Sequence, residues 1–309
     1  MTSDNAIPGR DIPPLPDGLR TAALRGLLSV RRALLGRMIE NTLVAAVEGA
    51  VRRAVADEVM PRYQQLAAHE VVEKNGPYDL VTVADRGAEE HLTASLTRLL
   101  PGSVVVGEEA VHADPTAYAA IRGAAPVWIV DPVDGTRQFV HGEPGFCTLV
   151  ALAVDGEVQA SWTYAPALDE MAVAVRGRGA TLNGVPLRSG SPAPGSALRV
   201  ATSHPDYTTE DQKKALRALE TEGVLPRPCG SAGLEYLAVA RGELEAVAFS
   251  WELAWDHAAG LLLVEEAGGT DRTRTGERYR IAGGNTLPFT AARDEATANR
   301  VRGLLAEED

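Results

Sequence analysis

Apolar positions recur every three to four residues in two early stretches, which predicts amphipathic helices. The first covers residues 41–60, with Asn41 as a candidate N-cap and Pro61 as a candidate terminator. Its apolar face consists of Val44, Val47, Val51, Val55 and Val59. The second helix follows a short segment, residues 79–82, and is closed by Pro101-Gly102. Its apolar face consists of Ala88, Leu92, Leu96 and Leu99.

Short apolar runs bounded by turn residues predict strands in the middle of the chain. Residues 104–106 and 127–130 have the composition of buried strands, and acidic residues follow both runs closely. Two hairpins are expected next, because Asp-Gly and Asn-Gly pairs favour tight turns. They join 148–154 to 157–164 around Asp155-Gly156, and 171–175 to 186–188 around Asn183-Gly184.

A stretch rich in Ser, Pro and Gly, residues 189–195, predicts a linker between two lobes. Beyond it, the expected elements are a strand over 198–202, helices over about 210–221 and 231–241, a strand over 244–249 and a helix over about 256–267. We therefore expect an N-terminal extension over 1–40, an α+β lobe over 41–190 and an α/β lobe over 191–309.

Composition narrows the classes of function. The chain has 309 residues, of which 45% are hydrophobic, and its formal net charge of −12 disfavours nucleic acid and anionic membranes as partners. Its two cysteines give neither a disulfide framework nor a zinc-ligand spacing. No stretch approaches the roughly 18 apolar residues of a membrane span, and no signal peptide is evident. We expect a cytoplasmic protein that acts on a small molecule.

The first 37 residues fit neither lobe. Residues 1–18 are rich in Pro and Gly, which predicts a disordered leader. Residues 19–37 carry leucines three to four apart among basic residues, so a basic amphipathic helix is expected. One function of such a helix is docking to a membrane surface or a partner. The alternatives are a solvated helix packed on the body, or sequence upstream of a start at Met38.

The hexapeptide Asp131-Pro132-Val133-Asp134-Gly135-Thr136 carries the strongest chemical signal. A buried strand delivers two carboxylates into a turn, and the helix that can start at Thr136 points its free N–H groups at the same place. Carboxylates attract a hard divalent cation, and amides at a helix N-terminus attract phosphate. The alternative is a plain strand–turn–helix in which Asp131 satisfies turn amides.

Three further acidic positions have simple explanations when taken singly. The pair Glu108-Glu109 follows a predicted buried strand, and adjacent like charges repel unless they are solvated or bound to a metal. Asp256 precedes a helix of apolar and small residues, where an N-cap is the simplest role. Asp85 also stands where a helix begins. Like Asp256, it is either a helix N-cap or a ligand.

Together, these segments resemble one family. The motifs are DLVTVAD (79–85), GEE (107–109), WIVDPVDGTRQFVHG (128–142) and AWDHAAGLLLVEEAGG (254–269). In order and interval they are similar to those of the inositol monophosphatase family of magnesium-dependent, lithium-sensitive phosphatases, over about residues 41–309. The resemblance implies an α/β fold, the layered αβαβα sandwich of the inositol monophosphatase and fructose-1,6-bisphosphatase type, usually assembled as a homodimer.

The resemblance also implies roles for individual residues. The ligands of two or three Mg²⁺ ions would be Glu108, Asp131, the Val133 carbonyl, Asp134 and Asp256. The catalytic residues would be Asp85, Thr136 and Glu108, with Thr136 and Asp85 orienting a water for in-line attack on phosphorus. The substrate would contact Gly135, Thr136, Ala232 and Phe249. A family lysine near the outer metal corresponds to Lys74.

Departures from the family pattern concern the substrate. Arg137-Gln138 stands where the family often has Thr-Asn, whereas Gly230-Ser231-Ala232 matches a substrate-facing segment of inositol monophosphatases. Phe249 stands seven residues before Asp256, where a glutamate commonly grips a substrate hydroxyl or amine. Either Glu252 replaces that glutamate, or the substrate has an apolar part, or Phe249 and Trp251 are packing residues. We expect His141 and His204 to be solvated or structural and Cys147 to be a core residue.

The resemblance thus implies a Mg²⁺-dependent phosphomonoesterase that hydrolyses a small polyol or sugar monophosphate, similar to inositol 1-phosphate, by attack of a metal-activated water. One alternative is a histidinol-phosphate phosphatase, which a basic residue after Gly-Thr favours; another is a nucleotide 3′-phosphatase. A catalytically silent member that binds or regulates a partner is a third. Every expected acidic ligand is present, which favours an active enzyme.

Overall fold

The computed structural model describes residues 39–76 and 79–306. The chain divides into two compact units, Met1–Leu43 and Val44–Asp309, and all strands described here belong to the second. The leader and the basic helix expected over residues 1–37 lie outside the described residues.

Helices and short helical turns form where the apolar spacing predicts them, and at several further places. The α-helices are α2 (Asn41–Ala54), α3 (Val83–Leu99), α4 (Glu108–Ala113), α5 (Thr136–Val140), α6 (Glu210–Arg217), α7 (Ala232–Ala240), α8 (Ala254–Glu266) and α9 (Glu295–Ala306). A π-helical turn, η1 (Val55–Val59), extends α2, and the 3-10 turns are η2 (Ala68–Glu70), η3 (Pro115–Arg122), η4 (Pro166–Leu168) and η5 (Pro205–Tyr207).

A seven-stranded sheet forms the larger layer, in the order β3-β4-β5-β6-β7-β8-β9. Its strands are β3 (Val104–Gly107), β4 (Val127–Asp134), β5 (Cys147–Val154), β6 (Glu157–Ala165), β7 (Glu170–Val175), β8 (Gly179–Leu182) and β9 (Val185–Pro186). β3 and β4 are parallel, and the other neighbours are antiparallel. The expected hairpin at Asp155-Gly156 is confirmed, since it joins β5 to β6.

The second expected hairpin is wrong in its partners. Asn183-Gly184 joins β8 to β9, whereas β7 pairs with β8 across an additional turn at residues 176–178. Gly177 and Gly179 both adopt positive φ there, which lets the chain reverse within three residues. The sequence pattern therefore predicted two strands where the chain forms three.

A five-stranded sheet forms the smaller layer, in the order β11-β10-β12-β14-β13. Its strands are β10 (Leu198–Thr202), β11 (Val224–Pro228), β12 (Ala246–Phe249), β13 (Thr270–Thr273) and β14 (Phe289–Ala292). β10 and β12 were expected, and the other three were not. A separate antiparallel pair, β1 (Val71–Gly76) with β2 (Asp79–Thr82), precedes α3.

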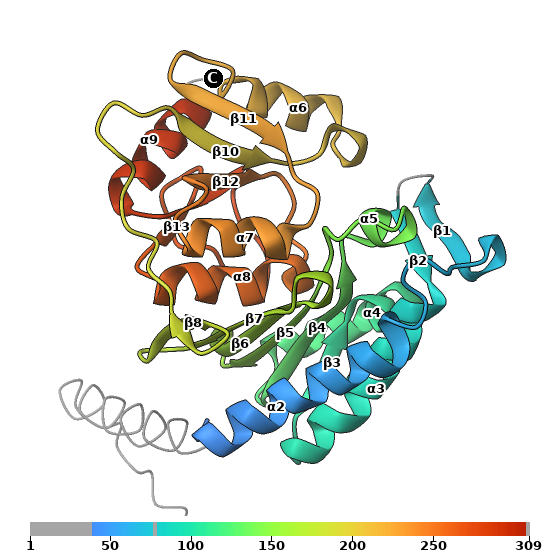
Figure 1. The fold of residues 1–309 in the computed structure, drawn as a ribbon. Coiled ribbons are helices and arrows are strands. Elements are labelled where there is room, and N and C mark those ends of the chain that lie inside the picture. Colours follow the sequence, from blue (N-terminus) through green and yellow to red (C-terminus); the bar gives the residue numbers. More distant parts are fainter. Residues whose placement is uncertain (1–38, 77–78, 307–309) are drawn as a thin grey trace, which may run out of the picture. The chain divides into compact units, whose positions relative to one another are not determined.

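Within the larger unit the helices and the two sheets alternate in layers (Figure 1). α3 covers one face of the seven-stranded sheet, and α7 and α8 lie between that sheet and the five-stranded one. α6 and α9 pack on the far face of the five-stranded sheet. The expected layered αβαβα sandwich is confirmed. No helix among the described residues is long and apolar enough to span a membrane.

The middle layer explains the composition of α8. Its residues from Ala254 to Val264 are buried, with the single exception of Asp256, which is half-buried. A helix that is apolar on all sides can be stable only when both of its faces are covered, as the two sheets cover α8. The one acidic side chain in this stretch lies in the first turn of the helix, beside the end of β4.

Candidate active site

Asp131 and Asp134 lie at the carboxyl end of β4, and a β-bulge gives them a common direction. The pairing of β4 with β5 shifts between them, because Asp131 pairs with Leu149 and Asp134 with Cys147. On a regular strand, residues three apart point to opposite faces of the sheet. The extra residue of the bulge corrects this, so that both carboxylates turn toward the same place.

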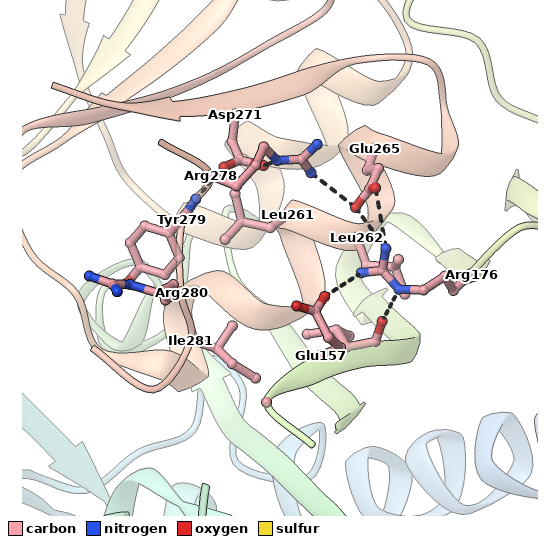
Figure 2. A pocket seen from close by; sticks show the side chains of 12 residues that line it. Glu157, Arg176, Leu261, Leu262, Glu265, Asp271, Arg278, Tyr279, Arg280 and Ile281 are labelled. Carbon is pink, nitrogen blue, oxygen red and sulfur yellow. Dashed lines mark hydrogen bonds and ion pairs between the residues drawn. The ribbon is translucent and has the colours of Figure 1, made fainter. Parts of the chain in front are cut away.

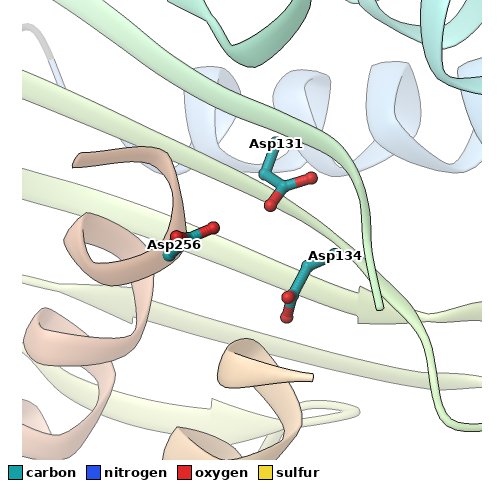
Figure 3. Close-up of side chains that lie close together, drawn as sticks. All are labelled: Asp131, Asp134 and Asp256. Carbon is teal, nitrogen blue, oxygen red and sulfur yellow. The ribbon is translucent and has the colours of Figure 1, made fainter. Parts of the chain in front are cut away.

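Asp256 completes the cluster from the other side. It is the third residue of α8, and its carboxylate approaches those of Asp131 and Asp134, as Figure 3 shows. One ligand atom from each of the three side chains lies within 4.8 Å of the others. The expectation that Asp256 is an N-cap is wrong, because Leu253 occupies that position.

Burial and mutual repulsion raise the pKa values of these carboxyls when no cation is present. Burial, followed by the charges of Glu108, Asp134 and Asp256, raises the pKa of Asp131 well above its usual value. Burial and the charge of Asp134 raise the pKa of Asp256 to about 7. Three carboxylates at this spacing repel one another strongly at neutral pH. A hard divalent cation with oxygen ligands would remove that repulsion, so the donor set fits such an ion.

The start of α7 binds Asp134 through three donors. The Ser231 hydroxyl and the Gly233 N–H both donate to Oδ2, at 2.6 Å each, and the Ala232 N–H donates to Oδ1 at 3.2 Å. Ser231 is also the N-cap of α7, since its hydroxyl accepts from the Leu234 N–H. The free N–H groups of this helix end therefore fix the orientation of one acidic side chain of the cluster.

Glu108 lies at the first turn of α4, next to a buried lysine. The Lys74 ammonium donates to Glu108 Oε1 at 2.7 Å and to Glu109 Oε1 at 2.5 Å, and its side chain is only 4% exposed. This lysine relieves the repulsion within the Glu108-Glu109 pair. Burial, opposed by Lys74, nevertheless raises the pKa of Glu108 to about 8. Glu89 anchors α4 from behind by accepting the N–H groups of Glu109 and Ala110.

Asp85 and Thr136 form a second polar pair beside the cluster. Asp85 is the third residue of α3, and its Oδ2 accepts the N–H and the hydroxyl of Thr82 at 2.8 and 2.6 Å. The Thr136 hydroxyl lies 3.4 Å from Asp85 Oδ1 and 2.9 Å from the Val133 carbonyl oxygen. Burial raises the pKa of Asp85 to about 6, so this carboxyl can accept a proton at neutral pH.

Gly135 makes the turn between β4 and α5. Its φ of 88° lies in the left-handed region, and a Cβ there would come 2.8 Å from the Gly145 carbonyl oxygen. Only glycine satisfies both conditions. The turn starts α5 at Thr136, directly after the two carboxylates.

Phe249, expected among the substrate contacts, is fully buried. The centroid of its ring lies 4.4 Å from the ring centroid of Trp251 and 5.8 Å from the ring centroids of Tyr236 and His257. The geometry thus matches the packing alternative for Phe249. Glu252 does not take the place of the absent glutamate, because its carboxylate accepts hydrogen bonds from Gly284 and Asn285 in a neighbouring loop.

The remaining candidates have local partners. Arg137 forms an ion pair with Asp206 at 2.7 Å. His141 Nδ1 contacts the Arg137 carbonyl oxygen, and His204 Nδ1 accepts the Asp206 N–H, so both histidines bind nearby backbone. Cys147 is buried as expected, but its thiol lies 3.5 Å from Asp134 Oδ2.

A separate cavity of about 270 Å³ lies over the C-terminal half of α8, whereas Asp256 is in the first turn of that helix. Figure 2 shows that two of the three arginines lining it, Arg176 and Arg278, are paired with acidic side chains. Arg176 binds Glu157 and Glu265, and Arg278 binds Glu265 and Asp271. Because most of these charges are already paired, the acidic cluster is the stronger candidate for an active site.

Two contacts of the cluster escaped prediction from the sequence. The Trp251 indole N–H donates to Asp256 Oδ2 at 2.5 Å, and the Gly233 N–H donates to Asp134 Oδ2. A serine before the apolar run of α7 signals an N-cap, which could have indicated that a helix end faces the cluster. No comparable local signal exists for Trp251.

Comparisons with known proteins identify the family of this chain. The model of the inositol monophosphatase family matches residues 40–307. An inositol monophosphatase of Dictyostelium discoideum is 33% identical over 238 residues, which are 75% of this chain and 84% of that protein. A histidinol-phosphatase of Chlorobaculum parvum is 35% identical over 190 residues, which are 61% of this chain and 70% of that protein.

Among solved structures, an IMPase of Thermotoga maritima superposes with a TM-score of 0.70 at 27% identity, covering 87% of this chain and 98% of that chain. The match confirms the expected fold, and the family match covers every residue of the acidic cluster. The chain belongs to the inositol monophosphatase family of phosphoric monoester hydrolases.

Proposed function

We propose that this protein is a Mg²⁺-dependent phosphomonoesterase that hydrolyses a small polyol or sugar monophosphate similar to inositol 1-phosphate. The observation that carries the proposal is the convergence of Asp131, Asp134 and Asp256 from two distant segments, with one ligand atom of each within 4.8 Å of the others. Two buried carboxylates and one half-buried carboxylate at this spacing suit a small cation with oxygen ligands, such as Mg²⁺.

These three carboxylates would hold the cation, with Glu108 and the Val133 carbonyl as further ligands of a two- or three-ion site. When bound, Mg²⁺ neutralises phosphate charge and makes a bound water more acidic. The N–H groups of Gly135 and Thr136 stand at the start of α5, where helix geometry leaves them without intrahelical partners, and they would bind phosphate oxygens.

Asp85 and Thr136 would remove the proton of the attacking water. Asp85 Oδ2 is engaged by Thr82, so Oδ1 remains to receive the proton of the Thr136 hydroxyl. Thr136 Oγ in turn accepts a proton of the water as the water oxygen forms its bond to phosphorus and the bond to the alcohol oxygen breaks. The leaving alcohol oxygen takes up a proton from solvent. A carboxyl whose pKa is about 6 is well matched to this task near neutral pH.

Hydrolysis of histidinol phosphate is the second candidate. The similarity to the Chlorobaculum parvum histidinol-phosphatase and the basic Arg137 after Gly-Thr favour it. Gly230-Ser231-Ala232 opposes it, because this segment matches inositol monophosphatases better than histidinol-phosphate phosphatases. The buried Phe249 does not discriminate between the two substrates. A nucleotide 3′-phosphatase and a catalytically silent binding protein are weaker alternatives.

The decisive measurement is phosphate release from a panel of monophosphates, with and without Mg²⁺. The panel contains inositol, histidinol, glycerol, hexose and nucleoside 2′- and 3′-monophosphates. We expect Mg²⁺-dependent turnover of a polyol or sugar phosphate, and loss of that turnover in Asp256→Asn. Asp211→Asn, a similar change on the exposed face of α6, is the matched control and should retain full activity.

Preference for histidinol phosphate would select the second candidate. Absence of turnover across the whole panel would contradict the proposed activity and favour the silent alternative.

The family resemblance further supports a homodimer, and the composition of the chain favours the cytoplasm; we include both in the proposal. Light scattering of the purified protein tests the first, and cell fractionation tests the second. We also retain the division into lobes at residues 41–190 and 191–309, which limited proteolysis within residues 189–195 would test.

A further inference from the structure

Trp251 links the acidic cluster to a set of buried aromatic rings. Its indole N–H donates to Asp256 Oδ2 at 2.5 Å, while its ring packs 4.4 Å from Phe249 and 5.0 Å from His257, measured between ring centroids. The side chain is half-buried, so its polar edge meets the cluster and its faces meet the core. An indole N–H can only donate a hydrogen bond, which suits a partner that must remain an anion.

The backbone of Trp251 is held by a buried hydrogen-bonded chain. His257 Nε2 lies 3.0 Å from the Trp251 carbonyl oxygen, and His257 Nδ1 lies 3.0 Å from the Tyr236 hydroxyl. Because a carbonyl oxygen only accepts, Nε2 must carry the proton and Nδ1 must accept from Tyr236. His257 and Tyr236 have no exposed surface, so this tautomer has no competing solvent partner.

We propose that Trp251 is a positioning residue for the metal ligand Asp256 and that Tyr236 and His257 hold it in place. A donor on Oδ2 fixes rotation of the Asp256 carboxylate and leaves Oδ1 for the cation. Hydrogen-bonding partners of metal-binding carboxylates typically change metal affinity by about 10–100-fold when they are lost. This inference rests on the proposed metal site.

The hydrogen bonds from Tyr236 through His257 to Trp251 hold the indole in a fixed position. Tyr236 belongs to α7 and His257 to α8, so the chain ties Trp251 to both helices of the middle layer. Gly260 lets the Tyr236 ring of α7 pack closely against α8, since a Cβ at position 260 would come 2.1 Å from that ring. The indole is thereby fixed to the same helices that present Asp256 and bind Asp134.

The test is calorimetric titration of the metal-free protein with Mg²⁺ alone. Trp251→Phe keeps an aromatic ring and removes the donor, and we expect its Kd for Mg²⁺ to rise about tenfold. Tyr236→Phe removes only the hydroxyl at the far end of the hydrogen-bonded chain. It should raise the Kd about threefold, which is less than the roughly tenfold effect expected when a direct partner of the ligand is lost. The Mg²⁺ concentration for half-maximal phosphate release should rise in parallel.

Trp162→Phe is the matched control. Its indole N–H donates to the Val44 carbonyl oxygen at 3.2 Å, and Val44 is not a proposed ligand. The substitution should lower the Tm and leave the Kd for Mg²⁺ unchanged. If the wild type binds Mg²⁺ and both Trp251→Phe and Tyr236→Phe bind it equally well, the inference is overturned while the proposed function stands. If the wild type binds no Mg²⁺, both fail together.

Discussion

Gly233 lies directly against Asp134. Its N–H donates to Asp134 Oδ2 at 2.6 Å, and a Cβ built on Gly233 would come 3.1 Å from the same oxygen. The same Cβ would come 2.6 Å from both the Cys147 thiol and the Leu149 side chain. The absence of a side chain at this position therefore brings the end of α7 into contact with β5 and with the proposed ligand.

Gly233→Ala should damage both stability and activity. The added methyl group must displace Cys147 or Leu149, and such overpacking typically costs about 1–3 kcal/mol. We expect a lower Tm and a weaker affinity for Mg²⁺, measured by thermal unfolding and calorimetry. Gly303→Ala in α9 is the control, because a Cβ there meets no atom within 4 Å. That change should be neutral or stabilising, by up to about 1 kcal/mol. Equal effects of the two substitutions would refute this account of Gly233.

The metal-free protein should lose stability as the pH rises. Burial and like charges raise the pKa of Glu108 to about 8 and that of Asp256 to about 7 in the folded state. Between the ordinary carboxyl pKa and these values, the folded state binds more protons than the unfolded chain. Its free energy of unfolding therefore falls through that window.

Thermal unfolding after EDTA treatment, at about pH 6 and about pH 8, measures this effect, because the proton linkage predicts a lower Tm at the higher pH. Added Mg²⁺ should raise the Tm more at the higher pH, since its ligands must be deprotonated. Asp256→Asn removes one titrating group and should reduce the dependence on pH. A Tm of the metal-free wild type that is unchanged or higher at the higher pH would contradict the prediction.

Thr136→Val should lower kcat by roughly 100-fold, the lower end of what a positioned proton acceptor contributes. The substitution keeps the side-chain shape and removes the hydroxyl that lies 3.4 Å from Asp85 Oδ1. Affinity for Mg²⁺ should change little, because the Thr136 side chain is not a proposed ligand. Thr136→Ser, which restores the hydroxyl, should recover most of the activity. Full activity of the valine variant in steady-state assays would remove Thr136 from the proton relay.

Phe249→Glu should unfold the protein instead of restoring a substrate contact. The position has no exposed surface and is surrounded by the rings of Tyr236, Trp251, His257 and Phe289, so a carboxylate there would be buried without a partner. The expected loss is about 4–5 kcal/mol, at the upper end for a single substitution. Phe249→Leu, which keeps an apolar side chain, should cost less in urea unfolding. A folded and active glutamate variant would mean that this side chain can reach the substrate.

The family, the layered fold and the acidic cluster could be predicted because their signals are local. The valine spacing of residues 41–60, the Asp155-Gly156 turn and the Asp-Pro-x-Asp-Gly-Thr motif each depend on a few neighbouring residues. Asp131 and Asp134 also follow from their motif. The bulge that turns both of them to one side depends on pairing with β5 and has no signature within β4 itself.

The elements that were missed depend on distant partners. β11 contains Pro226 and Pro228, which argue against a strand, but it lies at the edge of its sheet, where a missing N–H can be tolerated. β13 and β14 are four residues each and depend on pairing with each other, and β14 also pairs with β12. Phe249 matched a functional position in the family motif, whereas its environment depends on rings from three other segments.

The burial of α8 on all sides has a consequence for how variation in the core acts on catalysis. Because Asp256 lies in the first turn of this helix, we expect a change in packing along the helix to displace its carboxylate. Displacement of a reacting group by about 1 Å can cost about 100-fold in rate. Substitutions such as those at Gly260 or Leu263, which touch no substrate, would then alter turnover before they unfold the chain. The catalytic rate should therefore respond to small displacements of α8 that leave the overall stability almost unchanged.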